Sequence, residues 1–137
     1  NRENRGELGE LVRFLAPKVK GITIQFYYPY PETEDLRLAR EERVKALEEL
    51  MDLKREGYPI ACSFPTLEAL KYNTWRCHSW LIASAEPDGS ITYGCYLKGR
   101  AQISCADCGF AAHTEMSLAY DGHPAAIRAG MEIFDLC

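Results

Sequence analysis

Four cysteines with the spacing Cys-x17-Cys-x9-Cys-x2-Cys constrain the fold more than any other feature of the chain. They are Cys77, Cys95, Cys105 and Cys108. Two thiolates separated by two residues can bind one centre, because a tight turn directs both sulfurs to the same side. Cys77 precedes a predicted β-hairpin and Cys95 ends it, so strand pairing brings these two distant residues to one end. The spacing predicts a metal or iron–sulfur site.

The residues themselves leave the identity of the bound group open. Four thiolates suit both a tetrahedral zinc ion and a cubane cluster. Isolated cysteines are more often buried apolar residues, and we interpret Cys62 as a core residue and Cys137 as a terminal bystander. A disulfide framework is disfavoured, because the amino terminus reads as a charged helix and not as a secretory signal.

Several polar side chains near the cysteines are further candidates. His78 could replace Cys77 as a ligand, and His113 could hydrogen-bond a sulfur, although such histidines are more often partly buried polar residues. Lys98 and Arg100 could stabilise an anionic site, but a solvated loop accounts for them equally well.

The first half of the chain alternates between helical and strand patterns. Apolar residues at three- and four-residue steps predict helices, and β-branched and aromatic runs predict strands. The predicted order is helix, strand, helix, strand, helix, over residues 3–16, 22–28, 38–57, 58–63 and 66–72. The charged residues from Arg40 to Glu56 predict a solvated face of the long helix. Alternation of this kind implies parallel strands with crossover helices.

The pattern changes after Asn73. Two short apolar runs, 80–85 and 90–96, flank the turn sequence Glu-Pro-Asp-Gly and predict a β-hairpin. Helices are predicted after Gly109 and over 123–134, and the first amides of the former would offset the charge of the thiolates. We expect an α/β chain that is α+β overall.

Charge and hydropathy exclude some partners. The formal net charge is −4, and Lys and Arg alternate with Glu instead of forming a basic stripe, so nucleic acid is not expected as a partner. No apolar run approaches the roughly 20 residues that span a bilayer, and a cytoplasmic location is expected. The chain starts at Asn1 with a helical pattern, so we expect further sequence upstream.

A family resemblance adds to these inferences. The stretch Gly-Ile-Thr-Ile-Gln-Phe-Tyr-Tyr-Pro-Tyr-Pro over 21–31, the long helix, Pro-Asp-Gly-Ser-Ile-Thr-Tyr-Gly-Cys over 87–95, and Cys-Ala-Asp-Cys over 105–108 resemble radical S-adenosylmethionine enzymes. The resemblance is to the carboxy-terminal part of members that carry a SPASM or twitch extension. It implies that residues 1–73 are the last strand and helix units of a partial parallel barrel, and that 74–137 form a cysteine-rich, cluster-binding extension.

The same resemblance implies an auxiliary [4Fe-4S] cluster on the four cysteines, for electron transfer, substrate positioning or structural support. The CxxxCxxC motif of the family is absent. S-adenosylmethionine, a substrate and oxidoreductase activity are therefore expected only in a full-length enzyme, with the missing amino-terminal region as partner, and no catalytic residue is assigned here. Gln25, Tyr27 and Tyr28 could line a ligand pocket at the end of a barrel strand, although strand packing accounts for them. A non-catalytic structural zinc module is the alternative function.

Overall fold

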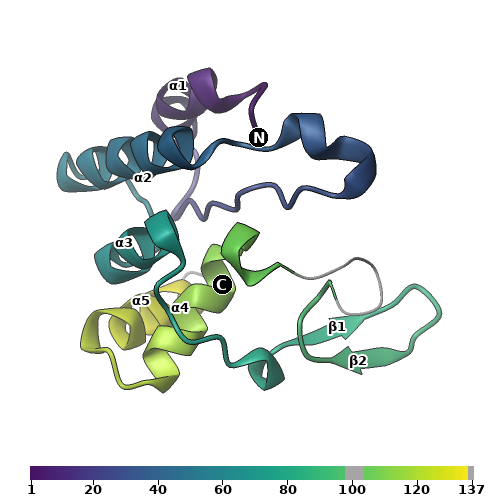
Figure 1. Cartoon of the computed structure of the whole chain (residues 1–137). Coiled ribbons are helices and arrows are strands. Elements are labelled where there is room, and N and C mark those ends of the chain that lie inside the picture. The colour runs from purple at the N-terminus through teal and green to yellow at the C-terminus, as the bar shows by residue number, and fades with distance from the viewer. Residues whose placement is uncertain (98–103, 136–137) are drawn as a thin grey trace.

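Helices dominate the fold, and one small antiparallel sheet accompanies them (Figure 1). The computed structural model describes residues 1–97 and 104–135. Its helices are α1 (Leu8–Leu15), α2 (Arg40–Arg55), α3 (Phe64–Tyr72), α4 (Ala111–Tyr120) and α5 (Pro124–Asp135), and its strands are β1 (Ala83–Ala85) and β2 (Ile91–Tyr93). Short 3-10 turns cover Arg5–Glu7, Pro31–Leu36, Ser79–Leu81 and Cys105–Asp107. The expected α+β class is confirmed. None of the described helices is long and apolar enough to cross a bilayer.

The hydrophobic core forms where α1, α2 and α3 meet. In Figure 1 α1 lies above α2, α3 lies beneath α2, and α4 and α5 follow below. The apolar side chains of α2 are the main contributors, because they recur at three- and four-residue steps and so fall on one face. The buried cluster consists of Val12, Ile22, Leu47, Leu50, Met51, Leu53, Ile60, Cys62, Leu67, Leu70 and Ala111.

Each core helix ends or begins at a residue suited to that position. Gly57 follows α2 with a φ of +95°, a conformation that glycine adopts without steric cost. The Ser63 hydroxyl accepts a hydrogen bond from the Thr66 amide at 3.3 Å and caps α3, which therefore starts at Phe64, slightly earlier than predicted. Asn73 ends α3 in the left-handed conformation, with a φ of +52°. The predicted helices are otherwise confirmed.

The predicted strands over 22–28 and 58–63 are wrong as strands. Their first residues do meet in a parallel bridge between Ile22 and Ile60, with hydrogen bonds of 2.7 Å to Pro59 and 2.9 Å from Ala61. A continuing parallel ladder would need the Ser63 amide, but that amide donates to the Glu115 carboxylate at 2.8 Å as α3 begins. The rest of 22–28 is extended chain, bridged once more at Gln25 to Phe110.

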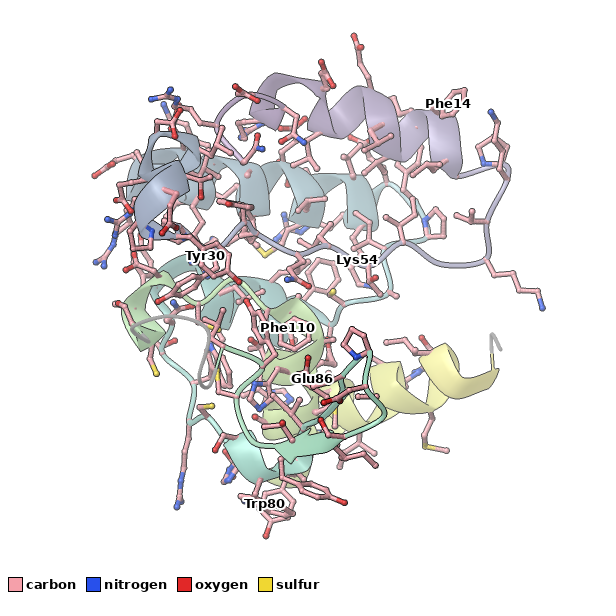
Figure 2. All side chains as sticks on the ribbon, turned by 90° about the vertical axis from the view of Figure 1, so that its right-hand side faces the viewer. Phe14, Tyr30, Lys54, Trp80, Glu86 and Phe110 are labelled. Carbon is pink, nitrogen blue, oxygen red and sulfur yellow. The ribbon has the colours of Figure 1, made fainter. Side chains whose placement is uncertain are left out.

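The predicted β-hairpin is confirmed, although its strands are shorter than expected. Ala83 pairs with Tyr93 and Ala85 with Ile91, and the Gly89 amide closes the turn on the Glu86 carbonyl at 2.9 Å. Trp80 and Leu81, expected at the start of the first strand, lie in the 3-10 turn Ser79–Leu81 instead. The hairpin stands away from the helices in Figure 1, and Figure 2 shows Trp80 at the outer edge of the molecule.

Truncating the centre of the core should destabilise the chain strongly. Leu47 is fully buried, so we expect Leu47→Ala to lower the free energy of unfolding by about 2–5 kcal/mol. Leu11 on α1 is 51% exposed, and Leu11→Ala should change it by less than about 0.5 kcal/mol. Urea unfolding of both variants checks this, and equal losses would contradict the position of the core.

Candidate functional site

All four predicted cysteines line one cavity of about 250 Å³. Cys77 comes from the segment after α3, and Cys95 is the second residue after β2. Cys105 and Cys108 come from the 3-10 turn before α4. Hairpin pairing and the turn thus bring together residues from three segments, as the spacing predicts. The other lining residues are Tyr28, Asn73, Trp75, Ser79, Tyr96, Leu97, Ser104 and His113. The role of the cysteines as ligands stays a prediction.

The four cysteines line the cavity, but they do not form a ready-made site for one metal ion. Within residues 1–97 and 104–135, no three His, Cys, Asp or Glu side chains are close enough together to hold a single metal ion. All five cysteines of these ranges are free thiols, and Cys62 is buried in the core as predicted. Cys137, Lys98 and Arg100 lie outside the described residues.

The turn that carries Cys105 and Cys108 is compact. The Cys108 amide donates to the Cys105 carbonyl at 3.3 Å, and the Asp107 amide donates to the Ser104 carbonyl at 3.1 Å. These two bonds leave the carbonyls of Ala106 and Cys108 without a partner inside the turn. Side chains from the helices satisfy them.

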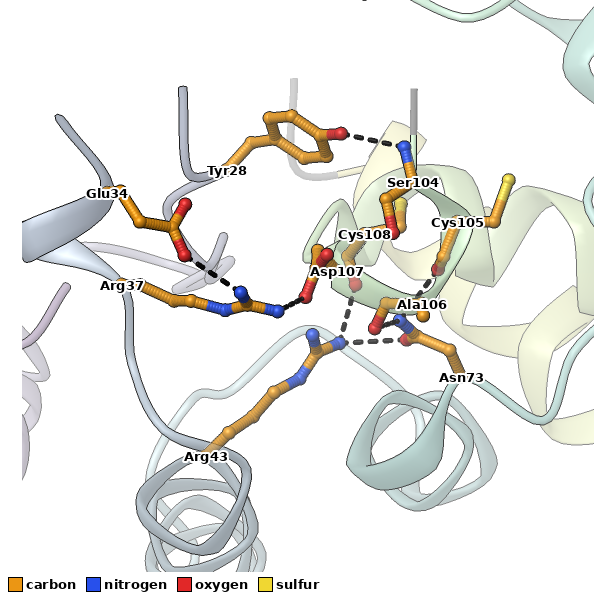
Figure 3. Close-up of polar contacts among 10 residues, drawn as sticks. All are labelled: Tyr28, Glu34, Arg37, Arg43, Asn73, Ser104, Cys105, Ala106, Asp107 and Cys108. Atoms are coloured by element: carbon orange, nitrogen blue, oxygen red, sulfur yellow. Dashed lines mark hydrogen bonds and ion pairs between the residues drawn. The ribbon is translucent and has the colours of Figure 1, made fainter. Parts of the chain in front are cut away.

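Asn73 and Arg43 attach this turn to the ends of α3 and α2 (Figure 3). The Asn73 amide nitrogen donates to the carbonyls of Cys105 at 2.9 Å and Ala106 at 2.8 Å. The Nη2 group of Arg43 donates to the Cys108 carbonyl at 2.6 Å and to the Asn73 side-chain oxygen at 2.8 Å. The backbone of the turn is therefore bound from the helical side of the molecule.

A second set of contacts holds the turn against the segment that precedes α2. Arg37 forms an ion pair with Asp107 and a second one with Glu34 at 2.8 Å. The Ser104 amide donates to the Tyr28 hydroxyl at 2.7 Å. Figure 3 shows these groups on the side of the turn opposite to Asn73.

Gly109 is required where the turn meets the extended segment. A Cβ atom at this position would lie 2.7 Å from the Phe26 carbonyl oxygen and closer still to the Phe26 Cβ. The glycine thus permits the 3.0 Å hydrogen bond from the Phe26 amide to the Gly109 carbonyl. Because glycine has no side chain, the cysteine turn can approach the Phe26 backbone this closely.

The thiols influence one another electrostatically. Burial is the largest cause that raises the pKa of Cys77, and the neighbouring thiols Cys105, Cys108 and Cys95 raise it further. Burial also raises the pKa of Cys108, while a hydrogen bond from the Phe110 backbone and the charge of Arg43 act in the opposite direction. Phe110 is the N-cap of α4 and directly precedes the helix, and the contribution expected from the helix amides themselves stays a prediction.

The two histidines have different positions. His113 is buried, and its Nε2 lies 3.2 Å from the His78 carbonyl and 4.0 Å from the Cys77 sulfur. A carbonyl only accepts, so Nε2 carries the proton, and burial lowers the pKa of His113 so that the ring is neutral. It cannot deprotonate Cys77, which disfavours a Cys–His nucleophile. His78 faces Asp121 at 2.7 Å and does not line the cavity.

Trp75 lines the cavity and also carries an unsatisfied buried donor. Its indole Nε1 is buried and has no hydrogen-bond partner among the described residues. The ring meets that of His113 edge to face, with centroids 5.4 Å apart. A buried N–H without an acceptor costs free energy to the folded state.

Sequence reasoning missed the residues that support the cysteines. The predicted solvated face of α2 is wrong at Arg43, which is only 8% exposed, although it holds for Glu41 and Lys45. Asn73 carried a signal, because Asn is the residue most tolerant of the left-handed helix end after glycine. Tyr28, set aside as a strand residue, lines the cavity, and Gln25 and Tyr27 line a neighbouring cleft.

The attachment by Asn73 can be separated from its backbone conformation. Asn73→Gly keeps the left-handed helix end and removes the two side-chain hydrogen bonds to the turn. We expect it to lower the free energy of unfolding by about 1–2 kcal/mol. Asn73→Ala should lose about 1 kcal/mol more, because alanine is strained at this φ. Urea unfolding checks both values, and wild-type stability in Asn73→Gly would show that the hydrogen bonds do not matter.

Comparisons with protein-family models, with curated proteins and with solved structures found no match for this chain. What the cavity binds is therefore inferred from its own geometry and chemistry. The features that bear on this are the four thiols and the arginine buried beside the cysteine turn.

Proposed function

We propose that the chain binds an auxiliary [4Fe-4S] cluster through Cys77, Cys95, Cys105 and Cys108. The observation that carries the proposal is that these four thiols, from three separate segments, line the same cavity. Thiolates are the ligands that such clusters require. A pair of cysteines separated by two residues and two more from a hairpin supply the full set.

The size of the cavity supports a cluster over a single ion. Its volume of about 250 Å³ far exceeds the roughly 10–15 Å³ that one water molecule needs. In a cubane each thiolate binds a different iron, so the four sulfurs lie farther apart than around one zinc ion.

Full ligation by protein thiols favours a role in electron transfer or structural support. A cluster with four cysteine ligands has no open iron for a substrate, and when bound it supplies one-electron redox chemistry. The residues of this chain hold it: Asn73 and Arg43 orient the turn of Cys105 and Cys108. No catalytic step is assigned to these residues.

We further propose that this site belongs to a radical S-adenosylmethionine enzyme. Residues 1–73 would be the end of its partial barrel and 74–137 its SPASM- or twitch-like extension. The parallel bridge between Ile22 and Ile60 is consistent with this order of elements. S-adenosylmethionine, the substrate and the radical-generating cluster would then bind an upstream region of the same enzyme, in a cytoplasm that keeps the thiols reduced.

Iron and sulfide analysis tests the cluster. After anaerobic reconstitution we expect about four iron and four sulfide per chain, with the absorption of a [4Fe-4S] cluster. Protein from native, anaerobically grown cells should contain the same. About one zinc and no sulfide in that native protein would contradict the proposal and favour the structural zinc module.

Cysteine variants test which residues are ligands. We expect Cys108→Ser to abolish the stabilisation gained on loading, because a bound group stabilises the folded state by about 2.7 kcal/mol at a hundredfold excess over its dissociation constant. Cys62→Ser is the matched control, since Cys62 is a buried cysteine outside the cavity. It should lower the thermal midpoint of both the free and the loaded protein and leave their difference intact. If both variants lost the increase in thermal midpoint on loading to the same extent, the ligand assignment would be refuted.

A further inference from the structure

Arg43 is the most deeply buried charged side chain at the cysteine turn. It leaves α2 beneath the turn (Figure 3). The residue is 8% exposed, and its guanidinium lies 5.1 Å from the centre of the Phe26 ring. Its Nη2 group donates only to neutral oxygens, those of Asn73 and of the Cys108 backbone. Its Nε has no partner among the described residues.

No carboxylate pairs with this buried cation in residues 1–97 and 104–135. The carboxylate of Asp107 is close enough to interact, but it forms its ion pair with Arg37. Arg40 on the same helix adds a like charge. A buried guanidinium keeps its proton, and an uncompensated buried charge is costly to the folded state.

We propose that Arg43 is the buried counter-cation of the loaded cysteine site and a positioning residue for Cys108. This inference rests on the proposed function, since it needs the four thiols to bind a metal or a cluster. Metal-bound thiols are deprotonated, so a loaded site with four of them is net negative. In the free protein the Arg43 guanidinium has no negatively charged partner among the described residues. The loaded site places negative charge next to it and so offsets the cost of burying the guanidinium.

Arg37 offers a matched comparison, because it contacts the same turn from the solvent. Both arginines reach the Cys105–Cys108 turn, but the Arg37 side chain is 48% exposed and pairs with carboxylates that are already present. Solvent screens its interaction with the thiolates. Removing Arg37 should therefore affect binding at the site much less than removing Arg43.

The test measures Co²⁺ affinity of the full chain by its thiolate charge-transfer absorption and by chelator competition. We expect Arg43→Gln, which removes the charge, to weaken Co²⁺ binding about 10- to 100-fold. Arg43→Lys, which keeps the charge, should recover most of that loss, and Arg37→Gln should stay within about threefold of wild type. After reconstitution with iron and sulfide, Arg43→Gln should shift the midpoint potential of the cluster to more negative values. Reduction adds negative charge to the cluster, and the variant lacks the positive charge that stabilises the reduced form.

The outcomes separate this inference from the proposed function. Wild-type protein that binds Co²⁺, with unchanged affinity in Arg43→Gln, overturns the role of Arg43 and leaves the cysteine site standing. Equal weakening in Arg43→Gln and Arg43→Lys overturns the electrostatic role. Wild-type protein that binds neither Co²⁺ nor a cluster overturns both proposals. If Arg43→Gln does not fold, Arg43→Met replaces it, since it removes the charge without burying an amide.

Discussion

The hydrogen bonds from Asn73 and Arg43 to the backbone of the cysteine turn are the contacts on which the site depends. A 3-10 turn of three residues satisfies few of its own carbonyls, so its conformation needs donors from elsewhere. Asn73 can supply two because α3 ends there in the left-handed conformation, which aims its amide at the turn. Arg43 reaches the Cys108 carbonyl from α2, and the core between α2 and α3 thereby fixes the position of two thiols.

The groups that hold the cysteine turn in place differ from the groups that would bind a ligand. The helices bind the carbonyls of the turn, while the thiols of Cys105 and Cys108 face a cavity completed by Cys77 and Cys95. Cys77 precedes the hairpin and Cys95 follows it, but the hairpin stands away from the helical core in Figure 1. A bound group that joins all four thiols would therefore link the hairpin to the helices, and it would couple ligand binding to the stability of the second half of the chain.

Local patterns explain why the helices and the hairpin could be predicted. The apolar period of α2, the Ser63 cap and the Pro-Asp-Gly turn each depend on residues that are close in sequence. The strands over 22–28 and 58–63 had equally good local signals and still did not form. Their ladder stops because the Ser63 amide donates to Glu115, a residue 52 positions away that no local pattern could reveal.

The sequence alone determined the four candidate ligands, the hairpin that joins two of them and the tight turn that carries the other two. Spacing and turn chemistry are local properties, and they limit where each sulfur can lie. Only the tertiary structure decided that all four line one cavity and that Arg43 is buried under the turn instead of solvated. These outcomes follow from the packing of segments distant in sequence, because burial of a polar group depends on which other residues surround it.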